Sequence, residues 1–188
     1  MSRFTVIYDA NVFYPAPLRD LLLRLASCGL FRARWSKEIE AEWVQNLLQN
    51  RPELANKLTR TVELINTNCH DCMVDDYQHL IQCIDLPDKD DRHVVAAGIK
   101  SGAELIITFN LKDFPKTALE KYGIEAIHPD DFIVDLFDLN TAKVLAAIAA
   151  QRSALKNPPR TPEELLDTLL KQGLPQTVKI LEQYKLAF

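Results

Sequence analysis

The stretch "DKDDRHVVAAGIKSGAELIITFN" (residues 88–110) predicts a helix that is followed at once by a buried strand. The apolar run at residues 94–97 predicts a helix over about residues 91–101, and Gly102 is the residue type that commonly ends helices. The run "AELIITFN" (residues 103–110) is rich in Leu and Ile and predicts a strand inside a sheet. A helix that leads into a buried strand is typical of the crossover units of parallel sheets.

The rest of the N-terminal part continues this alternation of strands and helices. "RFTVIYDAN" (residues 3–11) predicts a buried strand, and "IEAI" (residues 124–127) predicts a third, shorter one. Ser36 is a good N-cap for a helix that runs to about Asn50, whereas "LFRARWS" (residues 30–36) is expected to be irregular. Strands that alternate with helices imply a central parallel sheet and therefore an α/β fold.

The sequence changes character near Asn140. The residues after it contain no strand pattern, and they predict three helices separated by "NPPRTP" and "QGLP". Thr161 is placed as the N-cap of one of them, and Glu164 completes a capping box. We therefore predict a main domain at residues 1–138 and an all-helical C-terminal extension at residues 139–188.

The composition fits a globular protein without a large excess of either charge. Of the 188 residues, 47% are hydrophobic and 26% are charged, so the chain can bury a substantial core. The formal net charge of −4 argues against a protein that holds nucleic acid by overall positive charge, but it permits an enzyme that contacts a few phosphates through bound cations. The start shows no signal-peptide pattern, and no apolar stretch reaches the length of a membrane-spanning helix. We therefore expect a soluble, cytoplasmic protein that makes no membrane contacts.

The four cysteines include one close pair, Cys69 and Cys72, in the sequence "CHDC" around His70. Common zinc sites need a second such pair or two spaced histidines, and the sequence offers neither. The favoured interpretation is therefore that the thiols are reduced, with a structural metal at this point as the weaker alternative.

Polar side chains follow the two longest predicted strands. Asp9 follows the first strand, and Asn110 and Asp113 follow the second. Ligands of parallel sheets bind beyond the carboxyl ends of the strands, so these side chains are candidates for one common site. Asp91 begins the helix that returns to the second strand. The sequence leaves open whether that helix starts at this edge of the sheet or at the opposite one.

Four motifs follow one another along the chain: "YDANVF", "SKEIEAEW", "DKDDRHVVAAG" and "IITFNLKDFP". In order and spacing they resemble the four motifs of PIN domains, and the resemblance covers roughly residues 4–135. Among PIN domains, the sequence most resembles the proteins classed with bacterial VapC-type toxins. It implies a three-layer α/β/α fold with a central parallel sheet, plus the helical C-terminal extension, and a ribonuclease that depends on Mg²⁺ or Mn²⁺.

The resemblance also implies which residues form the site. The acidic positions that the family uses for catalysis and metal binding match Asp9, Glu42, Asp91 and Asp113. Helical angles put Glu40 nearest the apolar face of the helix and Glu42 at its edge, so the assignment of Glu42 rests on the resemblance, and Glu38 and Glu40 are expected to be solvated. The auxiliary polar positions match Asn11, Asp90, Thr108 and Asn110.

The chemistry of such an acidic set is sound in itself. Mg²⁺ and Mn²⁺ prefer oxygen ligands, and carboxylates that share a pocket repel one another and raise at least one pKa unless a cation is bound. A bound cation can then polarise a phosphodiester and lower the pKa of an attacking water. Simpler interpretations are available for single residues. Asp88 and Asp90 are expected to cap the helix or to favour its positive end, and His93 is expected to be a partly buried histidine rather than a ligand.

We therefore expect a metal-dependent endoribonuclease that serves as the toxin of a type II toxin–antitoxin system. The resemblance implies RNA as the substrate, an antitoxin protein as a partner and a homodimer as the assembly. Two alternatives remain. One is a receiver-like α/β module that binds Mg²⁺ without hydrolysing anything, although no Lys ends the third predicted strand. The other is a catalytically silent PIN scaffold, against which the complete acidic set argues.

Overall fold

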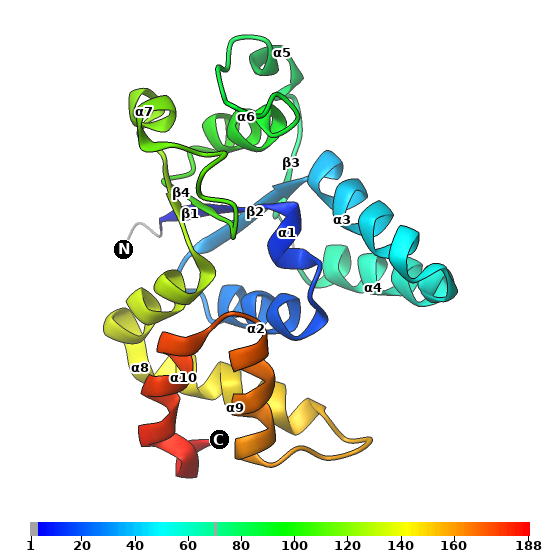
Figure 1. Cartoon of the computed structure of the whole chain (residues 1–188), viewed down its shortest axis with the longest axis vertical. Coiled ribbons are helices and arrows are strands. Elements are labelled where there is room, and N and C mark those ends of the chain that lie inside the picture. The colour runs from blue at the N-terminus through cyan, green and yellow to red at the C-terminus, as the bar shows by residue number, and fades with distance from the viewer. Residues whose placement is uncertain (1–3, 70) are drawn as a thin grey trace. The chain divides into compact units, whose positions relative to one another are not determined.

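The computed structural model describes residues 4–69 and 71–188, which form two compact units. The first unit contains residues 4–14 and the described residues of 31–127, and it holds the β-sheet. The second unit contains residues 15–30 and 128–188 and is built from helices. Figure 1 labels the elements of both units.

The first unit is built on a sheet of five strands: β1 (Thr5–Tyr8), β2 (Arg32–Ser36), β3 (Met73–Val74), β4 (Leu105–Ile107) and β5 (Glu125–Ile127). All neighbouring strands are parallel, and their order is β3-β2-β1-β4-β5. Val6 lies beside Ala33 of β2 on one side and beside Leu105 of β4 on the other. The chain adds β2 and β3 on one side of β1, and then β4 and β5 on the other side. The predicted α/β fold with a central parallel sheet is confirmed.

Helix α6 (Arg92–Ser101) packs against β1, β2 and β4, and it is the helix predicted at about residues 91–101. Gly102 follows it with a φ of 63°, the left-handed conformation in which glycine carries no steric cost. Gly98 allows α6 to approach the sheet closely, since a Cβ at this position would lie 3.2 Å from Cδ1 of Ile124. The other helical segments of the unit are α1 (Ala10–Phe13), α3 (Lys37–Asn50), η1 (Pro52–Leu54), α4 (Ala55–Asn68), α5 (Gln78–Ile81), α7 (Lys116–Leu119) and η2 (Glu120–Tyr122).

A cluster of buried aromatic rings joins β1, β2, α1 and α3. The ring of Tyr8 is stacked on that of Trp35, with centroids 6.4 Å apart and planes 2° apart. Phe13 meets Trp35 edge-on at 5.3 Å and is stacked with Trp43 at 6.0 Å. Aromatic pairs of this kind contribute roughly 0.5–1.5 kcal/mol each beyond the burial of their surface. The cluster therefore fixes α3 against the strands whose carboxyl ends lie next to it.

The prediction for residues 30–36 was wrong, because "LFRARWS" contains β2 rather than an irregular segment. Ala33 and Trp35 of this strand are buried, Arg32 is exposed and Arg34 is partly exposed. This is the alternation of a strand that covers the core with one face only. The strand was not recognised because it is short and contains two arginines, whereas the strand at residues 105–107 is continuously apolar.

The second unit consists of five helical segments: α2 (Ala16–Ser27), α8 (Pro129–Ala154), α9 (Pro162–Lys171), α10 (Pro175–Leu181) and η3 (Glu182–Ala187). The leucines of α2 pack against α8, which also contacts α10 and η3. The capping box predicted at Thr161 and Glu164 is confirmed, with both of its hydrogen bonds formed. Among the described residues, no helix is both long enough and apolar enough to cross a bilayer.

The predicted boundary between residues 138 and 139 lies within α8. Asn140 has non-helical torsion angles there, with φ −164° and ψ 86°, so two helical segments meet close to that point. The division into compact units differs from the predicted domains, because it groups α2 and the first turns of α8 with the C-terminal helices. The domain boundary itself stays a prediction.

A buried carboxylate connects α8 to α10 within the second unit. Asp130 is 2% exposed, and its two oxygens accept the backbone N–H groups of Gln176 and Thr177, both at 2.8 Å. These N–H groups belong to the first turn of α10, where the helix itself provides no acceptors. A negative side chain at this end is also favoured by the helix dipole. Asp130 therefore caps a helix that begins 45 residues beyond it in the chain.

Candidate active site

The site lies at the carboxyl ends of β1 and β4, the two strands between which the strand order reverses. Such a switch point is where ligands of open parallel sheets bind. Asp9 follows β1 directly, and Thr108 follows β4 directly. The structure thus brings together residues that are 99 positions apart in the sequence.

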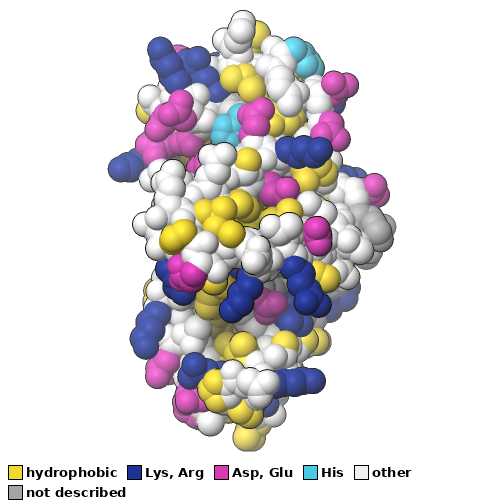
Figure 2. Space-filling model, turned by 90° about the vertical axis from the view of Figure 1, so that its right-hand side faces the viewer, with side chains coloured by type: hydrophobic (Ala, Val, Ile, Leu, Met, Phe, Trp, Pro, Cys, Tyr) yellow, Lys and Arg dark blue, Asp and Glu magenta, His cyan; other side chains and the backbone are white. Residues whose placement is uncertain are grey.

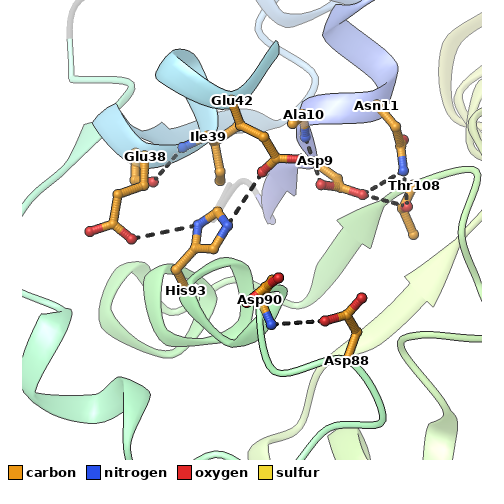
Figure 3. A network of polar contacts seen from close by, with 11 residues as sticks. Asp9, Ala10, Asn11, Glu38, Ile39, Glu42, Asp88, Asp90, His93 and Thr108 are labelled. Atoms are coloured by element: carbon orange, nitrogen blue, oxygen red, sulfur yellow. Dashed lines mark hydrogen bonds and ion pairs between the residues drawn. The ribbon is translucent and has the colours of Figure 1, made fainter. Parts of the chain in front are cut away.

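Asp9 is 4% exposed, and both of its carboxylate oxygens accept hydrogen bonds (Figure 3). Its Oδ1 accepts the backbone N–H of Ala10 at 2.6 Å. Its Oδ2 accepts Nδ2 of Asn11 at 2.6 Å and the hydroxyl of Thr108 at 2.7 Å. Asn11 also donates to Thr108 and accepts the backbone N–H of Phe109, so it bridges the segments after β1 and β4. The auxiliary residues Asn11 and Thr108 thus hold the Asp9 carboxylate in one orientation.

Burial raises the pKa of Asp9 to about 6, and the nearby charge of Glu42 acts in the same direction. The hydrogen bonds from Thr108 and Ala10 oppose this shift because they stabilise the ionised form. Ionisation of Asp9 is therefore disfavoured when no cation is bound, although both carboxylate oxygens accept hydrogen bonds.

Asp91 lies at the same edge of the sheet as Asp9, which settles the question that the sequence leaves open. Helix α6 runs from this edge back to the start of β4, and Asp91 occupies its N-cap position without a side-chain capping bond. Burial, together with the charges of Asp9, Asp88, Glu42 and Asp113, raises the pKa of Asp91 to about 7. The carboxylates of four separate segments therefore act on one another electrostatically.

Asp88 belongs to this group, although the sequence analysis assigns it to the helix start. Its charge acts on Asp91 more strongly than those of Glu42 and Asp113. Its Oδ1 accepts the backbone N–H of Asp90 at 2.9 Å, so it stabilises the turn before α6 rather than capping α6. Asp90 is exposed, and Figure 3 shows the two residues together in that turn. Neither residue caps α6 through a side-chain hydrogen bond, whereas the alternative that they favour its positive end, and the auxiliary role of Asp90, stay predictions.

Glu42 projects from α3 toward α6, where it meets His93. Ser36 caps α3 by accepting the backbone N–H of Ile39 at 3.2 Å, as predicted. Glu42 Oε2 lies 3.4 Å from Nε2 of His93, and Glu38 Oε2 lies 3.8 Å from Nδ1 of the same ring. Glu38 is exposed, as expected, but it also lies within ion-pair distance of His93.

Burial disfavours the charged form of His93, but the contact with Glu42 and the charges of Glu38 and Asp9 outweigh this effect. The pKa of His93 is raised as a result. A protonated imidazole at this position partly compensates the negative charge of the acidic side chains around it.

Asp113 and Asn110 lie in the turn that follows β4. The backbone N–H of Asp113 donates to the carbonyl of Asn110 at 3.1 Å, and the backbone N–H of Asn110 donates to the hydroxyl of Thr108 at 2.9 Å. Asp113 is partly exposed and Asn110 is exposed. Asp113 acts on Asp91 through its charge, and the roles of both residues stay predictions.

The comparison with protein families agrees with this arrangement. The PIN domain profile matches residues 5–112, which is more than half of the chain and includes Asp9, Glu42 and Asp91. The chain belongs to the PIN domain family. The predicted family is therefore confirmed, and a second profile, "VapC50 C-terminal domain", matches residues 129–183.

A relative of this PIN protein is known from Mycobacterium tuberculosis (strain ATCC 25618 / H37Rv), where it is described as "Putative ribonuclease VapC50". The two sequences are 49% identical over 82 residues, which cover 44% of this chain and 48% of the relative. The match thus spans about half the length of that relative. No solved structure matches the chain.

The residues at the switch point of this PIN domain fit a hard divalent cation in their chemistry. The side chains that converge on Asp91 are carboxylates, and the raised pKa values of Asp9 and Asp91 mark charge that a cation would neutralise. Within residues 4–69 and 71–188, no three or more His, Cys, Asp or Glu side chains form a ready-made set of metal ligands. Asp9, Glu42, Asp91 and Asp113 would therefore hold an ion only after their side chains adjust.

The cysteines lie apart from this carboxylate group. Cys69 and Cys72 are partly buried and form no disulfide bond, and the interpretation that they are reduced stays a prediction. His70, on which the alternative of a structural zinc depends, lies outside the described residues. On the face of the molecule drawn in Figure 2, acidic and basic side chains are interspersed, in keeping with the net charge of −4.

Proposed function

We propose that this PIN protein is a Mg²⁺- or Mn²⁺-dependent endoribonuclease, and that it is the toxin of a type II toxin–antitoxin system. The observation that carries the proposal is the gathering of carboxylates at the carboxyl ends of β1 and β4, where Asp9, Asp88, Glu42 and Asp113 act on the half-buried Asp91. A fold seldom gathers so many acids at one half-buried point unless they share a cation. The family and the ribonuclease name of the relative support the same reaction class.

The protein residues would act by binding the cation and by keeping its carboxylate ligands in position. Asp9, Glu42, Asp91 and Asp113 would supply the oxygen ligands, and a bound divalent cation would supply Lewis-acid chemistry for attack of water on a phosphodiester. Asn11 and Thr108 would keep the Asp9 carboxylate oriented through the hydrogen bonds described above. Burial of Asp9 would strengthen its interaction with the cation, since the surroundings screen charge less than water does.

The test is cleavage of RNA and DNA substrates with added Mn²⁺ by the parent and by two variants, Asp9→Asn and Asp91→Asn. Both variants are expected to lose cleavage by about two orders of magnitude or more, since each removes a charge from the cation site. Glu63→Gln, an exposed acid on α4, is the matched control and should cleave as the parent does.

Two results would contradict the proposal. Unchanged cleavage by both site variants would show that the carboxylate group is not the active site. Absence of any Mn²⁺-dependent cleavage by the parent, after separation from all other proteins, would favour the catalytically silent PIN scaffold instead.

The partners follow from the same proposal. We propose RNA rather than DNA as the substrate, an antitoxin that blocks the acidic site, and a homodimer as the assembly. Light scattering after size-exclusion chromatography measures the assembly directly. A small reading frame next to the gene, whose product copurifies with this chain and abolishes its cleavage of RNA, would support the antitoxin.

A further inference from the structure

The imidazole of His93 occupies a special position between two acids of one helix. Glu38 and Glu42 are four residues apart on α3, and this spacing puts both side chains on the same face. His93 belongs to the first turn of α6 and reaches across to that face. Figure 3 shows its ring between the two carboxylates, with one ring nitrogen directed at each.

The two contacts of the ring differ in quality. Nε2 lies 3.4 Å from Glu42 Oε2, within hydrogen-bonding distance, whereas Nδ1 lies 3.8 Å from Glu38 Oε2, which is an ion-pair distance only. The His93 side chain is 13% exposed, and among the described residues its Nδ1 has no hydrogen-bond partner. Buried ring nitrogens without a partner are uncommon in folded proteins, and they are often found where a side chain serves function.

Glu42 needs such a contact if it is to stay at the site. Its side chain is 41% exposed and has three rotatable bonds, and it lies near the negative charges of Asp9 and Asp91. Repulsion and side-chain entropy both favour a conformation that points into solvent. The contact with His93 involves Oε2, so Oε1 is a separate atom that stays available for another interaction.

We propose that His93 is a positioning residue, which holds Glu42 at the edge of the carboxylate group so that its second oxygen can serve a bound cation. The inference rests on the proposed metal-dependent function and adds a residue to it. Side chains that orient metal-ligating carboxylates typically change metal affinity by about 10- to 100-fold when they are removed. Glu38 Oε2 lies on the opposite side of the ring, 3.8 Å from Nδ1.

The first test measures the contact without any metal. The ¹⁵N chemical shifts of the His93 ring are recorded by NMR in the parent, in Glu42→Gln and in the control Glu63→Gln. We expect the Nε2 signal to shift in Glu42→Gln only, since that variant replaces the acceptor carboxylate by an amide. Identical His93 signals in the parent and in Glu42→Gln would overturn the proposal.

The second test measures Mn²⁺ binding directly, by electron paramagnetic resonance of the free ion. His93→Ala is expected to weaken binding by about 10-fold or more. His93→Gln should restore most of the affinity, because its amide N–H can donate near the position of Nε2. His79→Ala, an exposed histidine on α5, is the control and should bind as the parent does.

A double variant separates positioning from a general loss of structure. If His93 acts through Glu42, His93→Ala should have no further effect on Mn²⁺ binding in a Glu42→Gln protein. An equal loss in both backgrounds, or parent-like binding by His93→Ala, would overturn the proposal. A parent that binds no Mn²⁺ would instead overturn the proposed function, and the NMR measurement would still decide whether His93 holds Glu42.

Discussion

Asp9 and Asp130 are both almost completely buried carboxylates, one in each compact unit. Both follow the end of a strand closely, and both accept hydrogen bonds on each of their oxygens. They differ in their neighbours. Asp130 faces the first turn of a helix, where its charge is favoured, whereas Asp9 faces the other acids of the switch point, where its charge is opposed.

This difference shows that burial of an acid does not by itself indicate a functional site. The N–H groups at the start of α10 stabilise the charge of Asp130, so this carboxylate needs no ligand. Asp9 also accepts hydrogen bonds on both oxygens, but burial and the charge of Glu42 raise its pKa to about 6. A carboxylate that the fold orients well and yet leaves in a repulsive field is the better candidate for cation binding.

The largest effect is expected for exchange of Asp9. Asp9→Asn should lower Mn²⁺-dependent RNA cleavage by roughly 10²- to 10³-fold, or about 3–4 kcal/mol, while Asp130→Asn cleaves at nearly the parent rate wherever it is folded. Single-turnover cleavage rates of the two variants, with circular dichroism as a check of the fold, make the comparison. Similar losses in both would remove the distinction between the two buried acids.

The second prediction reverses the comparison. Asp130→Ala leaves two N–H groups of α10 without their acceptor, and it should lower the free energy of unfolding by about 2–3 kcal/mol. Urea titration followed by circular dichroism measures this loss. A change in unfolding free energy near zero would show that water replaces the carboxylate fully and that Asp130 is not required for α10.

The third prediction concerns pH in the absence of divalent cations. The folded protein binds a proton at Asp91 with a pKa of about 7, far above the ordinary value of 3.8, so folding is favoured at low pH. The free energy of unfolding should therefore fall as pH rises from about 4 to about 7, by roughly 1–2 kcal/mol because solvent screens this half-buried group. Asp9, with its pKa of about 6, contributes in the same direction.

Urea titrations in EDTA at several pH values measure this dependence, and Asp91→Asn is the control. The variant should have a flatter profile and should exceed the parent in stability near pH 7.5. Added Mn²⁺ should stabilise the parent most at that pH. A parent whose stability rises steadily from pH 4 to pH 7 would show that burial and neighbouring charges do not raise the pKa values of Asp91 and Asp9 as described.

The smallest effect is expected at the capping box of α9. Thr161→Ala removes the side-chain acceptor for the N–H of Glu164 and should lower the unfolding free energy by about 0.5–1 kcal/mol without changing RNA cleavage. The same urea titration detects it. A loss as large as that of Asp130→Ala would mean that exposed and buried caps contribute equally to the second unit.

The sequence was sufficient for those parts of the fold in which local signals agree. The strand at residues 105–107 is continuously apolar, and α6 ends at Gly102 as its residue type suggests. The strand β2 could not be recognised from its short alternation of Ala33 and Trp35 with arginines. The acidic positions Asp9, Glu42, Asp91 and Asp113 were named from the resemblance, and their catalytic and metal-binding roles stay predictions.

Other parts of the site depend on contacts that no local pattern encodes. Asp88 joins the acidic group because the turn before α6 brings it toward Asp91. His93 meets Glu38 and Glu42 because α3 and α6 both begin at the same edge of the sheet. Asp130 starts one helix and caps another, and only the tertiary structure connects the two.

The junction of β2 and α3 has a further consequence. Ser36 is both the last residue of the strand and the cap of the helix, so the connection contains no loop residue that could absorb a change in length. One residue inserted after Ser36 would rotate the helix by about 100° relative to the sheet. Glu42 would then turn away from His93. The site therefore depends on the number of residues between Ser36 and Glu42 as much as on the side chains themselves.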